Sequence, residues 1–119
     1  MKAYIGRVRL MKLTNALVEV ALAVMSNAND RLWGYNLSRQ TGLRSGVLYP
    51  ILHRMLDEGW LVDGWEELDP SIDKRPPRRY YRLTDEGSRQ LGALLQSARN
   101  DRRFAALKPA FNAVQPRVA

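Results

Sequence analysis

The chain has 119 residues, of which 45% are hydrophobic and 26% are charged, a composition typical of one globular domain. It contains no cysteine, which excludes disulfides, thiol catalysis and thiolate metal sites, and no apolar run approaches the roughly 18 residues that a membrane-spanning helix requires. The net charge is +7, which favours a polyanionic partner over a merely soluble basic protein.

Residues 1–13 form a predicted basic N-terminal arm. Basic and apolar side chains alternate there without the apolar stretch of a signal peptide, so we expect a cytoplasmic protein that makes no membrane contact. The arm is either solvated or lies along nucleic-acid phosphates.

A first helix is predicted to begin after Thr14, whose hydroxyl can accept from the amides of the next turn. The following apolar residues share one broad face: Ala16, Leu17, Val20, Ala21, Val24 and Met25. Because the face is wide for so short a helix, we expect burial on two sides, against the core and against a partner subunit. Turn-forming residues 27–30 follow.

Two further helices and the turn between them form a predicted helix-turn-helix. The second helix opens at Trp33 and ends at Gly42, and the third follows a three-residue connection, with Ser45 as its N-cap and Gly59 as its left-handed stop. Apolar residues recur at helical spacing along the third helix: Val47, Leu48, Ile51, Leu52, Met55 and Leu56.

The opposite face of the third helix is polar and carries Ser45, Gly46, Tyr49, His53 and Asp57, with Arg54 at its edge. A short helix with an apolar back and an aromatic, basic front suits the DNA major groove, whereas the alternative is a helix that only covers a core. Pro50 either shapes the helix start so that its amides face phosphate, or packs inward. Arg54 either faces DNA or pairs with Glu58.

A β wing is predicted after the third helix. Residues 60–66 are rich in strand formers, residues 68–77 hold three prolines and cannot be regular, and residues 78–83 alternate as a strand. Charge is segregated along this region, with seven acidic residues from Asp57 to Asp73 and then five basic ones from Lys74 to Arg82. The wing arginines either contact phosphate and the minor groove or neutralise the acidic run.

Thr84 is the predicted cap of a last helix, and acidic residues in its first turn suit the helix dipole. Its apolar stripe consists of Gly87, Leu91, Leu94, Leu95 and Ala98. We expect Pro109 to end any helix and residues 109–119 to be a disordered tail. The predicted organisation is therefore a DNA-binding part over residues 14–83 and a C-terminal helical part over residues 84–108.

Four motifs in order make the sequence similar to the PadR family of bacterial transcriptional regulators. They are Gly34-Tyr35 at the second helix, the run from Gly46 to Leu52 in the third, the run from Asp57 to Leu61 leaving it, and the run from Arg79 to Gly87 after the wing loop. The resemblance covers about residues 14–98.

The resemblance implies a mainly α fold, a winged helix-turn-helix with a two-stranded wing, that binds a pseudo-palindromic operator as a homodimer and usually represses. By position it assigns DNA contacts to Ser45, Gly46, Tyr49, Pro50, His53, Arg54, Lys74, Arg75, Arg78 and Arg79. Tyr35 of the second helix and Arg44 of the turn complete the predicted DNA-binding set. Dimerisation through the C-terminal helix, helped by the first helix, is assigned to Leu17, Leu91, Leu94, Leu95 and Ala98.

Some short members of the family enclose an aromatic-lined drug pocket at the dimer interface, but residues 91–98 contain no aromatic, so a small-molecule effector is unsupported. A single histidine without cysteine supports neither a metal site nor a hydrolase, and no cofactor or enzymatic activity is expected. The expected function is sequence-specific regulation at double-stranded DNA. The alternatives are a winged-helix module that binds another protein and a non-specific architectural DNA-binding protein.

Overall fold

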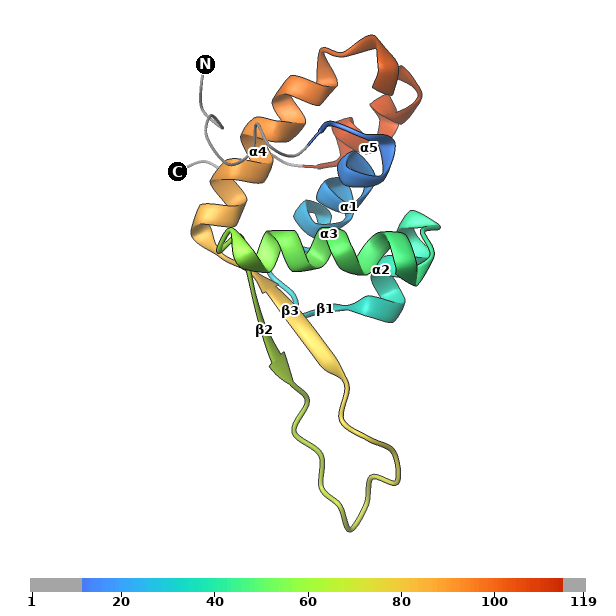
Figure 1. The fold of residues 1–119 in the computed structure, drawn as a ribbon, viewed down its shortest axis with the longest axis vertical. Helices are drawn as coiled ribbons and strands as arrows, with labels where there is room; N and C mark the ends of the chain where they lie inside the picture. The colour runs from blue at the N-terminus through green and yellow to red at the C-terminus, as the bar shows by residue number, and fades with distance from the viewer. Residues whose placement is uncertain (1–11, 115–119) are drawn as a thin grey trace.

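The computed structural model describes residues 12–114, which form a helical body with a projecting wing (Figure 1). The elements in chain order are α1 (Asn15–Ser26), β1 (Leu32–Trp33), α2 (Gly34–Thr41), α3 (Ser45–Asp57), β2 (Leu61–Trp65), β3 (Arg79–Leu83), α4 (Asp85–Arg99), the 3-10 helix η2 (Arg102–Leu107) and α5 (Lys108–Ala113). The wing lengthens the molecule to 52 Å along its longest axis, against 26 Å along each of the other two.

Helix α1 is the centre of the core. The Thr14 hydroxyl accepts from the Leu17 amide at 3.1 Å, which confirms the predicted cap. All residues from Leu17 to Met25 except Glu19 are buried, because α2, α3, α4 and α5 surround the helix. The expected broad apolar face is therefore present. The helices that cover both of its sides belong to this same chain, so no partner subunit is needed to bury it.

The sheet has three antiparallel strands in the order β1-β3-β2. Register runs from Leu61 opposite Leu83 to Trp65 opposite Arg79, and Leu32 of β1 faces Tyr81. Strand β1 was not predicted, because two residues carry no periodicity; α2 consequently starts at Gly34 rather than at Trp33. Leu61 and Tyr81, on one sheet face near the body, are buried in the core, whereas Trp65 farther along β2 is exposed.

Two glycines end helices as predicted, while one expected cap is wrong. Gly42 has φ 74° and Gly59 has φ 75°, the left-handed geometry that suits glycine. Ser45, however, is the first residue of α3 and not its cap. Arg44 is extended and its carbonyl accepts from the Val47 and Leu48 amides, so the helix starts one residue earlier than expected.

The predicted apolar stripe of α4 is confirmed as a buried face, and Thr84 caps the helix by accepting from the Gly87 amide at 2.9 Å. The five side chains expected at a dimer interface, Leu17, Leu91, Leu94, Leu95 and Ala98, are at most 7% exposed within the single chain. They form the core between α1 and α4, so contact with a partner is not what buries them.

The C-terminal prediction is wrong for residues 109–113. Pro109 lies in the first turn of α5, where a missing amide costs nothing, so it begins a helix instead of ending one. Phe111 anchors this helix in the core with 4% exposure. Residues 115–119 and most of the basic arm, residues 1–11, lie outside the described part of the chain. Within residues 12–114, no helix is long and apolar enough to cross a membrane.

Candidate nucleic-acid interface

The outer face of α3 is open to solvent. Leu48, Leu52 and Met55 on its inner face are fully buried. The predicted contact residues of this helix and the turn before it are all exposed: Arg44, Ser45, Gly46, Tyr49, Pro50, His53 and Arg54. Exposure of Pro50 rules out the alternative in which this proline packs inward.

The first turn of α3 presents free backbone donors. Arg44 makes no side-chain capping bond, and the amides of Ser45 and Gly46 donate no hydrogen bond to any residue within 12–114. A side chain added at Gly46 would meet nothing within 4 Å, so the surface there is unobstructed. Exposed amides at a helix N-terminus are suited to bind a phosphate.

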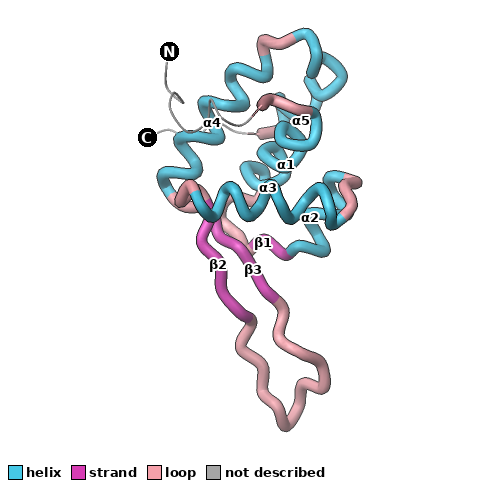
Figure 2. Tube along the Cα trace, in the orientation of Figure 1, coloured by secondary structure: helices cyan, strands magenta, loops and turns pink. Residues whose placement is uncertain are grey.

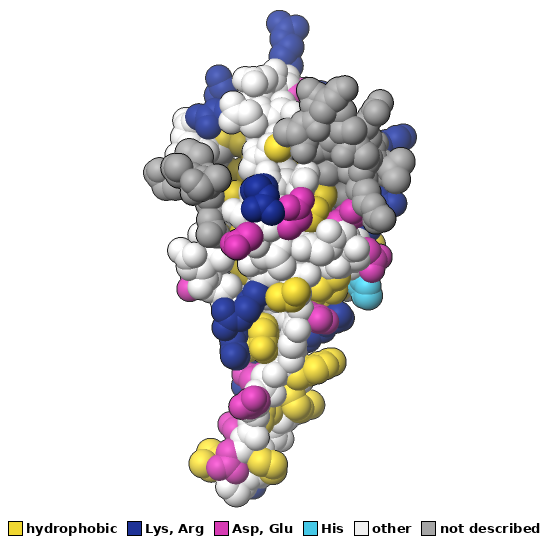
Figure 3. All heavy atoms as spheres, turned by 90° about the vertical axis from the view of Figure 1, so that its left-hand side faces the viewer, with side chains coloured by type: hydrophobic (Ala, Val, Ile, Leu, Met, Phe, Trp, Pro, Cys, Tyr) yellow, Lys and Arg dark blue, Asp and Glu magenta, His cyan; other side chains and the backbone are white. Residues whose placement is uncertain are grey.

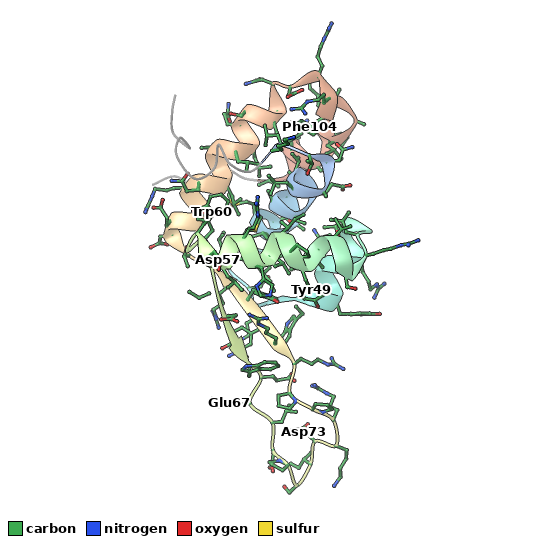
Figure 4. All side chains as sticks on the ribbon, viewed as in Figure 1. Tyr49, Asp57, Trp60, Glu67, Asp73 and Phe104 are labelled. Carbon is green, nitrogen blue, oxygen red and sulfur yellow. The ribbon has the colours of Figure 1, made fainter. Side chains whose placement is uncertain are left out.

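Tyr49 joins α3 to the start of α2. Its side chain lies between α3 and the base of the wing (Figure 4), and a Cβ atom at Gly34 would stand only 2.1 Å from its hydroxyl oxygen. Gly34 therefore permits the two helices to approach with Tyr49 between them. Neighbouring Tyr35 is 69% exposed on α2, with the Arg39 guanidinium 5.6 Å from its ring centroid.

A cleft of about 480 Å³ lies where α2, α3 and the wing meet. Its walls contain four of the residues assigned to DNA binding: Tyr35, Tyr49, Arg78 and Arg79. Its other lining residues were not among the predicted DNA contacts: Trp33, Gly34, Asn36, Glu66 and Tyr81. The alternation in residues 78–83 placed Arg79 and Tyr81 on one face, but without β1 nothing connected that face to α2.

The wing consists of β2, β3 and the long loop between them (Figure 2). Two of its arginines bind carboxylates of the wing itself. Arg75 donates to both Glu66 oxygens at 2.7 and 3.0 Å, and Arg79 donates through Nε to Asp63 at 2.8 Å. The hydrogen bond from Arg75 lowers the pKa of Glu66, and the bond to Asp63 raises the pKa of Arg79.

These pairs favour the neutralising role that was one of two expectations for the wing arginines. Acidic side chains are spaced along the wing in the face shown in Figure 3. The side chains of Lys74 and Arg78, in contrast, donate no hydrogen bond to any described residue, and both are exposed. Arg82 of β3 is likewise exposed, with the Tyr80 ring centroid 6.0 Å away, so these three wing cations are bound by no described carboxylate. Among residues 12–114, no cluster of His, Cys, Asp and Glu could hold a metal ion.

The structure therefore brings predicted residues of α2, of α3 and of the wing root (Arg78 and Arg79, where the loop returns to β3) to one cleft, while the other predicted residues of α3 and of the turn before it are exposed outside the cleft lining. Lys74 and Arg75 lie farther out, in the loop between β2 and β3.

The chain is similar to one family of known proteins. Residues 22–93 match the family model described as the transcriptional regulator PadR-like family. No curated protein matches the chain.

Solved structures share the fold at low identity. A PadR-like transcription factor from Bacteroides fragilis is 23% identical, with a TM-score of 0.56 over 85% of this chain and 92% of that one. The protein smu.1704 from Streptococcus mutans UA159 is 22% identical, with a TM-score of 0.59 over 86% and 93%. A PadR family transcription regulator from Clostridium difficile R20291 is 21% identical, with a TM-score of 0.53 over 78% and 94%. Since the family model matches more than half of the sequence, the protein belongs to the PadR-like family of transcriptional regulators and has its winged helix-turn-helix fold.

Proposed function

We propose that the protein is a sequence-specific repressor that binds a pseudo-palindromic operator as a homodimer. The observation that carries the proposal is the open outer face of α3, with its unbonded first amides beside Tyr49, His53 and Arg54. A helix of this kind fits the major groove, and the cleft and wing root beside it offer further contacts to the backbone. The same proposal makes the protein cytoplasmic and non-enzymatic, located on the nucleoid when bound.

We also propose that α4 contributes the dimer contact, although of the side chains first expected there only Leu95 lines the surface concerned. A groove of about 430 Å³ separates α4 from the ends of α1 and α5. Its apolar lining residues are Leu22, Met25, Leu95, Phe111 and Val114, and Gly92 of α4 lies among them. This groove supports a docking role for the region, with a second copy of the chain as its occupant. Phe111 is the one aromatic among the described residues that line it, so we do not propose an aromatic-lined effector site.

The experiment that tests the function is selection of bound sequences from a random duplex pool, using the full chain at about physiological salt. An inverted repeat with half-sites about one helical turn apart is the expected result for a dimer that places two α3 helices in successive major grooves. His53→Ala and Arg54→Ala should each weaken binding to the selected site. Arg102→Ala is the matched control, because it removes an exposed charge from η2, outside the proposed interface.

Other results of this selection would favour one of the alternative functions. Binding without enrichment of any sequence would indicate a non-specific architectural protein. A wild-type chain that binds no duplex even at low salt would point to a protein-interaction module. A reporter gene placed behind the selected site then gives the sign of regulation, with lower expression expected for a repressor.

A further inference from the structure

The sheet has an outer face that lies apart from the proposed DNA contacts. Paired residues of neighbouring strands point to the same face of a sheet, and the faces alternate along each strand. Tyr81 is buried and lines the cleft with Tyr49 of α3, so its neighbour Tyr80 points to the opposite face. Gly64 of β2 and Trp33 of β1 are the partners of Tyr80. We call the surface formed by the following residues the outer sheet face: Arg31, Trp33, Val62, Gly64, Tyr80 and Arg82.

The Tyr80 ring is held in place on this face. A Cβ atom at Gly64 would lie 2.6 Å from its hydroxyl oxygen, so the end of the ring lies over the glycine of the neighbouring strand. The Trp33 ring meets it edge-on, with the centroids 5.8 Å apart. The guanidinium carbon of Arg31 lies 4.1 Å from the ring centroid, and that of Arg82 lies 6.0 Å from it. One ring thus supports two guanidinium groups.

These two guanidinium groups have no counter-ion among the described residues. Both side chains are exposed, and neither makes a hydrogen bond or an ion pair within residues 12–114. Asp63 and Glu66 are bound by other arginines of the wing, and Asp30, adjacent in sequence to one of the two, forms no ion pair with a described residue. Two like charges beside one ring repel each other, so this surface attracts an anion.

The surface suits a carboxylate of a protein better than a base or a phosphate of the bound duplex. The Arg31 guanidinium lies over the Tyr80 ring, so a base cannot stack there. Val62, the partner of Arg82 across the strands, is 52% exposed and adds an apolar part that a phosphate backbone would not use. Because the outer sheet face points away from the cleft, a duplex docked on α3 would not cover it.

We propose that the outer sheet face binds an acidic segment of a partner protein. Its carboxylates accept from the Arg31 and Arg82 guanidinium groups, and an apolar side chain of the segment packs against Val62. A guanidinium group that lies on an aromatic ring keeps the N–H groups at its edge free, and a carboxylate can accept two of them at once. The proposal goes beyond the proposed function and does not rest on it, since a different face of the molecule would bind DNA.

The first test is selection of peptides that bind the full chain, from a random library displayed on phage. Peptides in which Asp or Glu stands beside apolar residues are the expected result. The double variant Arg31→Ala with Arg82→Ala should bind the best selected peptide roughly tenfold more weakly, the combined effect expected of two exposed ion pairs.

The matched control is the double variant Arg39→Ala with Arg102→Ala. It removes the same charge from two exposed arginines, and Arg39 also lies over a tyrosine ring, 5.6 Å from the centroid of Tyr35. Its affinity for the peptide should equal that of the wild type. An equal loss in both double variants would reduce the binding to net charge and overturn the proposal, as would a selection that yields no acidic peptides.

A measurement on the wild type locates the site without any substitution. When the selected peptide is added, the side-chain Nε–H signals of Arg31 and Arg82 should shift in NMR spectra, whereas those of Arg39 and Arg102 should stay in place. Peptide binding that leaves the signals of Arg31 and Arg82 unchanged would place the contact elsewhere and overturn the proposal.

A duplex separates this proposal from the proposed function. The wild type saturated with its selected duplex should bind the peptide about as tightly as the free protein, because the two ligands use opposite faces. A duplex that displaces the peptide from the outer sheet face would assign this face to nucleic acid and overturn the proposal. If the wild type binds no duplex, the proposed function fails, and the peptide selection and the arginine signals still decide whether the acidic segment binds.

Discussion

At the scale of single residues, the sequence motifs correspond to close contacts between segments far apart in the chain. At Gly34, the Tyr49 hydroxyl occupies the space that a Cβ atom would fill. Gly87 is similar: a Cβ there would lie 2.1 Å from the carbonyl oxygen of Trp60. That carbonyl also accepts from the Thr84 amide at 3.0 Å, which fixes α4 to the end of α3. Gly87 is thus required by a backbone atom outside its own motif, whereas the neighbour of Gly34 is the end of the Tyr49 side chain.

Gly87→Ala should consequently destabilise the protein. The added methyl group would collide with backbone rather than with a flexible side chain, so relief requires α4 to move. We expect a loss of about 1–3 kcal/mol, the usual cost of overpacking, measured as a lower midpoint in urea unfolding. Gly92→Ala is the matched control: it lies in the same helix, has nothing within 4 Å of the new atom, and should gain about 0.5–1 kcal/mol. Equal effects of the two changes would contradict this account.

At the scale of elements, the wing is held by ion pairs at its base and in its loop. The Glu66 carboxylate accepts from the Arg75 side chain and from the Arg78 amide, which joins the two ends of the loop. The pKa of Glu66 therefore lies below its ordinary value of 4.5, with the Arg75 hydrogen bond as the largest cause. A depressed carboxyl pKa gives stability that is present above the ordinary pKa and is lost as the pH falls through the lower folded value.

Acidification should thus release the loop in a window below pH 4.5, without unfolding the helical body. NMR titration of the Glu66 carboxyl carbon measures this directly. Arg75→Ala should raise its midpoint toward 4.5, because the principal hydrogen bond is lost. Lys74→Ala removes a neighbouring charge that makes no such bond and should leave the midpoint in place. A midpoint unchanged by Arg75→Ala would show that the pair does not form in solution.

The elements also show what the sequence could predict. Periodicity and capping residues were sufficient to predict the helices α1, α3 and α4, because each buries one apolar stripe and has a recognisable first or last residue. They failed for β1, whose pairing with β3 depends on residues almost fifty positions apart. Pro109 was misread because a proline that stops one helix can equally begin another, and only the burial of Phe111 distinguishes the two. The exposed face of α3 could be predicted from spacing, whereas the cleft depends on the tertiary contact of α2 with the wing and could not.

At the scale of the whole molecule, the body has only one layer of helices around α1. The inward-pointing side chains of α4 are already buried in the core of the single chain. A charge placed at Leu91 should therefore unfold the chain rather than separate two subunits. Within residues 12–114, the apolar groove between α4, α1 and α5 is a surface that a partner can still occupy.

Gly92 offers a way to test the dimer without damaging the core. A side chain there meets nothing within 4 Å, and the residue lines the groove. Gly92→Glu should therefore keep the helical circular dichroism of the wild type while placing a charge where the second copy would dock. Light scattering should give about twice the chain mass of 13.6 kDa for the wild type and for Gly92→Ala, and the single mass for Gly92→Glu.

Dimerisation also determines how many DNA phosphates the protein neutralises. Two subunits neutralise about twice as many phosphates as one, so the slope of log affinity against log salt for Gly92→Glu should be about half that of the wild type. Loss of the inverted repeat in a selection with this variant would follow from the same cause. A variant that retains the doubled mass would place the subunit contact outside the groove. A wild-type protein of single mass would remove the homodimer from the proposed function and leave the α3 face to its own test.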